Sequence, residues 1–86
     1  MDLDILLLHH FGTTELDDLD EAAIADGLER VRIAFGLESD SGRRFALWIV
    51  LHALGEAPDP AKAFKTAGER KAAEAYARAA ARMDDA

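Results

Sequence analysis

The sequence predicts an all-α protein, a small bundle of four to five helices around a buried central helix at about residues 42–54. The stretch Phe45–Leu54 contains a single polar side chain, His52. A helix that is apolar on every side has no face for water, so we expect the other helices to cover it. Alanine is abundant, and the chain has only six glycines and two prolines, which favours helices over strands. A chain of 86 residues has room for one core, so we expect a single helical domain over residues 1–86.

The first helix is expected to begin after Asp2 and to end at Gly12. Leu3, Leu6 and Leu7 lie at helical spacing and form its expected inward side. The same aliphatic run also fits a buried strand, so both interpretations stay open at this point.

The second helix follows an acidic segment, residues 13–20, in which Thr14 and Asp18 are alternative N-caps. Gly36 is expected to end this helix in the left-handed conformation, which would fold Leu37 back onto Val31. The helix is predicted from apolar residues that recur every three to five positions, namely Leu16, Leu19, Ala23, Leu28, Val31 and Phe35.

The central helix has Asp40 or Ser41 as its expected N-cap, and Gly55 follows its last residue, Leu54. Trp48 lies in the middle of this helix with apolar neighbours one turn away, so we expect its indole ring to be buried. The side chains expected to pack around the central helix are Leu19, Leu28, Val31, Phe35, Phe64 and Tyr76.

The last part of the chain is predicted to form a kinked pair of helices rather than one straight helix. Asp59 followed by Pro60 marks one helix start, and Thr66 with Glu69 three residues later marks another. Helical phase continues through the second start, and residues 83–86 are expected to fray. The residues in this phase are Phe64, Gly68, Ala72, Tyr76, Ala79 and Met83.

Charge is divided unevenly along the chain. Residues 1–40 carry eleven acids and two bases, residues 41–86 carry six acids and eight bases, and the formal net charge is −7. Either the two parts attract each other inside the bundle, or the first part forms an acidic docking face. In both cases the chain repels a phosphate backbone, so nucleic acid is not an expected partner.

Composition also bears on the compartment. Cysteine is absent, which leaves no disulfide framework and no thiol nucleophile. The longest apolar run, Phe45–Leu54, is well short of the ~20 residues that span a membrane. Asp2 and Asp4 stand where a signal peptide has its basic region. We therefore expect a cytoplasmic protein with no membrane partner.

No residue pattern predicts catalysis, a metal or a cofactor. His9 and His10 are adjacent and diverge by about 100° on a helix, and His52 has no partner at ligand spacing. The carboxylates of residues 15–21 are dense, but such a run beside a helix start is a solvated cap rather than an acid–base pair. The chain is therefore not expected to be an enzyme.

Ser41, Gly42, Arg43 and Arg44 form the candidate anion-binding site. Free amides at a helix start, a glycine that admits a ligand and two guanidinium groups suit a phosphate or a carboxylate. Two cations at a helix start oppose the helix dipole, so a negative group is expected near them. An acid from the first part of the chain is the internal alternative to a ligand.

Ile5 and Leu8 form the candidate interface on the first helix. A short helix packs one face against its neighbours, which leaves these two side chains to the side of that face. They either form an association surface or tuck under the Ala-rich last helix. The predicted function is a small acidic, non-catalytic module for protein–protein interaction or self-association, with a protein partner or a homodimer. Small-anion binding at Ser41–Arg44 is the alternative.

Overall fold

The computed structural model describes residues 3–84, which form five α-helices and one short 3₁₀-helix. No strand occurs within this range, which confirms the all-α prediction and makes the strand interpretation of the first segment wrong. The predicted N-cap Asp2 lies outside the described residues. The elements are α1 (Leu3–Phe11), η1 (Leu16–Asp18), α2 (Glu21–Leu37), α3 (Ser41–Ala53), α4 (Pro60–Ala63) and α5 (Ala67–Asp84).

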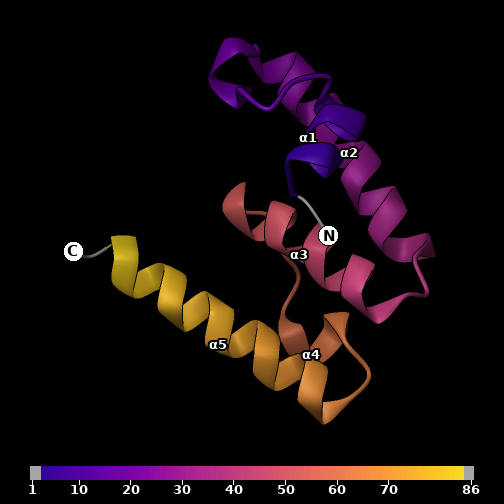
Figure 1. Cartoon of the computed structure of the whole chain (residues 1–86), viewed down its shortest axis with the longest axis vertical. Coiled ribbons are helices and arrows are strands. Elements are labelled where there is room, and N and C mark those ends of the chain that lie inside the picture. The colour runs from indigo at the N-terminus through magenta and orange to yellow at the C-terminus, as the bar shows by residue number, and fades with distance from the viewer. Residues whose placement is uncertain (1–2, 85–86) are drawn as a thin grey trace.

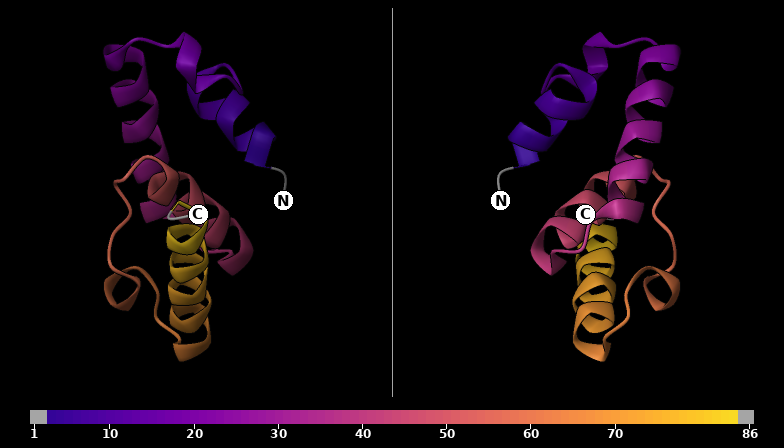
Figure 2. Two further views of the ribbon diagram at one scale, coloured as in Figure 1. Left: turned by 90° about the vertical axis from the view of Figure 1, so that its left-hand side faces the viewer. Right: turned by 90° about the vertical axis from the view of Figure 1, so that its right-hand side faces the viewer.

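The helix α3 lies between two pairs of helices (Figure 1). The pair α1 and α2 stands on one side, joined at its far end through η1, and the pair α4 and α5 stands on the other side (Figure 2). Contacts of α3 with α1, α2 and α5 hold the pairs together. This arrangement confirms the predicted bundle around a central helix.

The core is built on α3, as its apolar composition requires. Trp48 is only 1% exposed, and its indole Nε1 donates a hydrogen bond to the carbonyl oxygen of Pro58 at 2.9 Å, so its predicted burial is confirmed. Burial of the indole with a satisfied N–H makes this residue the largest single contribution to the core. The residues predicted to surround α3 all pack there, with Val31, Phe35 and Phe64 buried and Leu19, Leu28 and Tyr76 partly buried.

Side-chain caps set the starts of the helices. The carboxylate of Asp20 accepts the amide of Ala23 at 2.8 Å and begins α2, so the predicted caps Thr14 and Asp18 are wrong. The 3₁₀-helix η1 occupies the segment in which the helix was expected to begin. Asp40 caps α3 as predicted, because its carboxylate accepts the amide of Arg43 at 2.9 Å.

The junction of α2 and α3 differs from the prediction. Gly36 is not in the left-handed region, α2 continues through Leu37, and Leu37 is 80% exposed instead of folding back onto Val31. The chain turns in an extended conformation at Glu38, whose carboxylate accepts the amides of Ser39 and Asp40 at 3.1 and 3.3 Å. These bonds satisfy the linker amides, so the turn needs no left-handed glycine.

Two other glycines do end helices in the left-handed region. Gly12 follows α1 with a φ of 78°, and Gly55 follows α3 with a φ of 76°. Glycine adopts this conformation without the steric penalty of a side chain, so both predicted helix ends are confirmed.

The last part of the chain forms two helices, as predicted. Thr66 accepts the amide of Glu69 at 3.1 Å, and its hydroxyl donates to the Glu69 carboxylate at 2.8 Å, which gives α5 a start of its own. The break resets the helical phase, so Ala73, Tyr76 and Ala77 face the core. The predicted inward residues Gly68, Ala72 and Ala79 are exposed instead. Met83 lies on the face of Tyr76 and is exposed because the last turns of α5 extend past the end of α3 (Figure 1). Helix α5 continues through Met83 and Asp84, where fraying was expected, and residues 85–86 lie outside the described range.

The ring of Phe11, the last residue of α1, lies against Gly27 of α2. A Cβ atom built at this position would lie within 2.8 Å of three atoms of the Phe11 ring. The absence of a side chain therefore allows the ring to rest against the backbone of α2.

We predict that Gly27→Ala lowers the free energy of unfolding by about 1–3 kcal/mol, because Phe11 and α1 must move away from α2. Gly36→Ala is the matched control in the same helix, since a Cβ there meets no atom within 4 Å. The control should raise the free energy of unfolding by up to about 1 kcal/mol, because alanine is the better helix former. Urea denaturation followed by circular dichroism measures both. Equal effects of the two changes would contradict the close approach.

Candidate functional site

Arg44 joins the ends of three helices. One guanidinium nitrogen, Nη1, donates to the carbonyl oxygens of Phe35 and Glu38 at 2.7 and 3.4 Å, and Nη2 donates to the carbonyl oxygen of Ala63. Phe35 and Glu38 lie at the C-terminal end of α2, and Ala63 is the last residue of α4. Carbonyl groups at helix ends lack intrahelical partners and carry partial negative charge, so a cation between them satisfies both helices.

The guanidinium group of Arg44 also lies on an aromatic surface. Its Cζ is 4.1 Å from the ring centroid of Phe35 and 5.9 Å from that of Phe64. Both distances fall in the range of cation–π contacts. The negative partner expected for Arg44 is therefore a set of internal carbonyl oxygens and ring faces rather than an acid of the first part of the chain.

The four predicted anion-site residues are only partly brought together. Arg43 is exposed, and its guanidinium Nη1 lies 4.0 Å from the carboxylate oxygen Oε1 of Glu38. The carboxylate of Asp40 already accepts the backbone amide of Arg43. Its Oδ2 also lies next to Gly42, 3.3 Å from where a Cβ atom would stand if this residue had a side chain. Ser41 faces an open pocket together with Arg44. Anion binding at this helix start stays a prediction, with Ser41 and Arg44 as the residues that share a pocket.

This pocket, named the polar pocket, has a volume of about 450 Å³ and adds two basic residues that the sequence did not single out. They are Lys62 and Lys65, on α4 and in the segment after it. Neither forms an ion pair with any residue in the described part of the chain. No local pattern could have identified them, because only the fold brings α4 beside the start of α3. The polar side chains of the pocket are Glu38, Ser39, Ser41, Arg44, Lys62, Lys65 and Glu69.

The candidate interface residues on α1 both face solvent. Ile5 is 63% exposed and Leu8 is 53% exposed, so they do not tuck under α5, and that interpretation is wrong. The other side of α1, which carries Leu6, Leu7 and Phe11, packs on the core. This nine-residue helix packs one side on α2 and α3, which leaves Ile5 and Leu8 on its outer side.

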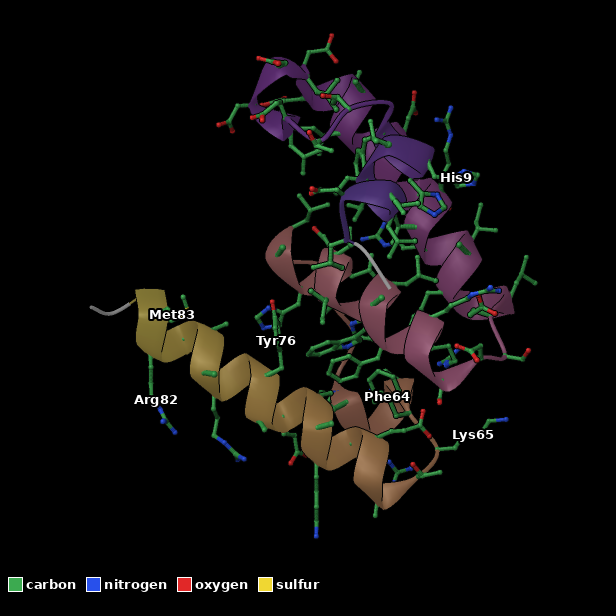
Figure 3. All side chains as sticks on the ribbon, viewed as in Figure 1. His9, Phe64, Lys65, Tyr76, Arg82 and Met83 are labelled. Atoms are coloured by element: carbon green, nitrogen blue, oxygen red, sulfur yellow. The ribbon has the colours of Figure 1, made fainter. Side chains whose placement is uncertain are left out.

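An apolar groove of about 180 Å³ lies between α1, η1, α3 and α5. Tyr76 contributes its only side chain with a polar atom, and this ring points from α5 toward α3 (Figure 3). Four separate segments form the groove, so no single stretch of sequence indicated it. Its lining residues are Leu3, Leu7, Leu16, Ile49, Val50, Ala53, Leu54 and Tyr76.

His10 and His52 pack inside the protein, whereas His9 is exposed. His10 is buried, and burial lowers the pKa of its imidazole, with His9 and Arg30 lowering it further, so the ring is neutral at pH 7. His52 lies between aromatic rings, with centroid distances of 5.2 Å to Trp48 and 5.7 Å to Tyr76. Within the described residues, no group of three or more His, Cys, Asp or Glu side chains is placed to hold a metal ion.

No known protein family, curated protein or solved structure matches this chain. Among the described residues, no helix combines the length and the apolar character needed to cross a bilayer. Function is therefore inferred from the residues and their geometry alone.

We predict that Arg44→Met lowers the free energy of unfolding by about 2–3 kcal/mol, because partly buried carbonyl groups lose a charged donor. Arg43→Met is the matched control, since its side chain is 61% exposed and its Nη1 lies 4.0 Å from the carboxylate oxygen Oε1 of Glu38. The control should change the free energy of unfolding by less than about 0.5 kcal/mol. Urea denaturation measures both, and equal losses would contradict the structural role of Arg44.

Proposed function

We propose that this chain is a non-catalytic protein-interaction module that binds a basic protein through the outer face of α1. The observation that carries the proposal is the exposure of Ile5 and Leu8, 63% and 53%, three residues apart on one helix. Side chains at this spacing are neighbours on a helix surface, so the two form one apolar patch. A patch of large aliphatic side chains in water is typical of a protein–protein contact.

The charge layout supports a basic partner over a second copy of the chain. Residues 1–40 carry eleven acids and two bases. In the described range, two ion pairs link this part to the remaining chain, Arg32 with Glu56 and Arg43 with Glu38. Among the described acids of this part, five have side chains with no ion pair or hydrogen bond and are therefore available to a partner, namely Glu15, Asp17, Asp18, Glu21 and Asp26. A symmetric dimer through α1 would bring the acidic surfaces of two copies together, and like charges at an interface lower affinity.

We predict that the double change Ile5→Glu with Leu8→Glu weakens partner binding by at least about tenfold, because it places two charges in an apolar contact. The partner is first isolated from host cells with the wild-type chain and then titrated as a purified protein by calorimetry. Ile33→Glu with Leu37→Glu is the matched control, since these α2 side chains are 54% and 80% exposed. The control should bind like the wild type.

Two results would contradict the proposal. One is a partner whose affinity is the same for the α1 double variant and for the α2 control. The other is a dimer of the wild-type chain that dissociates on the α1 double change with helical circular dichroism intact, which would make a second copy the partner.

A second candidate function is the binding of a small anion in the polar pocket. It is favoured by Lys62 and Lys65, which lie beside Ser41 and have no ion-pair partner within residues 3–84. The acids of the pocket are already engaged, since Glu69 accepts from Thr66 and Glu38 accepts two backbone amides. Two ammonium groups and a serine hydroxyl suit a phosphate group.

We predict that inorganic phosphate shifts the backbone amide NMR signals of residues 41–44 more than those near Arg78 and Arg82, which are exposed bases outside the pocket. Lys62→Ala with Lys65→Ala should remove the larger shifts, whereas Arg78→Ala with Arg82→Ala should leave them. Shifts of equal size at both places would mean general charge screening instead of a site.

A further inference from the structure

The apolar groove is a second feature of the same interaction module. We infer that it receives one bulky apolar side chain from a basic, amphipathic helix of the partner. This inference rests on the proposed function and specifies the chemistry of the partner. It concerns the inner side of α1, whereas the proposed function rests on Ile5 and Leu8 on the outer side.

The size and lining of the groove fit a single anchor side chain. Its volume is about 180 Å³, and Leu3, Leu7, Ile49 and Leu54 are among its walls. An apolar cavity of roughly 150 Å³ holds a benzene molecule, so a leucine or phenylalanine side chain fills this one. Walls from four elements would contact the inserted side chain, and the partner helix would cover the open side and exclude water, as at the energetic centre of a protein interface.

The wall formed by α5 continues beyond the groove. Met83 follows Tyr76 by seven residues, which places both on one face of the helix, about 10 Å apart along its axis. Met83 is 78% exposed, and the last turns of α5 extend past the end of α3 (Figure 1). A partner helix with apolar residues at positions i and i+7 matches this spacing. Methionine adapts to the shape of such a neighbour.

Acids adjoin Leu16, the groove residue that η1 contributes. Leu16 lines the groove, and its neighbours Glu15, Asp17 and Asp18 are exposed. None of these three acids forms an ion pair inside the part of the chain that the structure describes. Lysine or arginine side chains flanking the anchor of the partner would meet these carboxylates, which favours a basic helix over a neutral or acidic one.

The bases of α5 do not oppose this charge pattern. Arg78 follows Tyr76 by two residues, so it projects about 200° away around the helix. In Figure 3 the side chain of Arg82 points away from that of Tyr76. The face of α5 that borders the groove therefore presents Ala80 and Met83 rather than a positive charge.

The test uses the full chain and a fluorescein-labelled 18-residue amphipathic peptide of leucine and lysine, with binding followed by fluorescence anisotropy. Ala53→Phe fills the groove from its wall without removing any core side chain. Ala25→Phe is the matched control on an exposed site of α2 outside the groove. Ala53→Phe should weaken binding at least about tenfold, because the anchor side chain loses its pocket, and the control should bind within about twofold of the wild type.

The charge contribution is tested separately. Asp17→Asn with Asp18→Asn should weaken binding about threefold and reduce its dependence on salt, because two carboxylates at the rim are removed. A peptide in which glutamate replaces every lysine should bind at least about tenfold more weakly than the lysine peptide. Circular dichroism establishes that each variant keeps its helices. Equal binding of the two peptides would overturn the basic partner.

Three further outcomes separate this inference from the proposed function. Peptide binding that survives Ala53→Phe but is lost on Ile5→Glu with Leu8→Glu would overturn the groove and leave the outer face of α1 as the docking surface. Peptide binding lost on Ala53→Phe alone supports the groove and contradicts the outer face. Self-association of the wild-type chain that Ala53→Phe abolishes would make a second copy the occupant and overturn the inference.

Discussion

The arrangement of the helices depends on arginine side chains that satisfy carbonyl groups at helix ends. Arg44 on α3 donates to the ends of α2 and α4, and Arg70 on α5 donates from Nε to the carbonyl oxygen of Phe64 at 2.7 Å. The four residues of α4 are too few to form a stable helix alone. Because two cations hold the end of α4, Phe64 stays extended and buried against Trp48 and Phe35. The hydrogen bonds of Arg44 and Arg70 at the end of α4 therefore help to place Phe64 in the core.

Local sequence signals predicted the features that are decided locally. Asp40 and the Thr66–Glu69 capping box act within one turn of their own helix, and both were predicted correctly. The burial of Trp48 was also predicted correctly, from the apolar residues of its own helix, although its hydrogen-bond partner Pro58 lies outside that helix.

The prediction that Gly36 ends α2 in the left-handed conformation was wrong. The Glu38 side chain accepts the amides that follow it, so the turn needs no left-handed residue. The predicted inward face of α5 was wrong in part, because it extended the helical phase of Phe64 into α5. The chain breaks between α4 and α5, so that phase is not carried over.

The candidate sites depend on contacts between distant segments, so the sequence located them only in part. The position of Ile5 and Leu8 off the inward face of α1 could be predicted from helical spacing alone. Whether α5 would cover them depended on the direction of α5, which residues near the Thr66 turn determine. Arg44 was singled out for its charge, but its partners are backbone carbonyl groups, which look alike in any sequence. The lysines of the polar pocket and the walls of the apolar groove lie together only in the folded chain.

Helix α1 provides both the outer apolar patch and one wall of the groove, yet among its own residues only His10 and Phe11 are buried. Leu6 and Leu7 pack on the core but are only partly buried, so we expect this nine-residue helix to open by local unfolding at a lower free energy than the whole domain. In the proposed interaction module, each such opening would remove both docking surfaces at once. The apparent affinity for a partner would then be the intrinsic affinity multiplied by the fraction of molecules in which α1 is closed. A change inside the fold that stabilises the contact between Phe11 and Gly27 would raise that fraction without altering either docking surface.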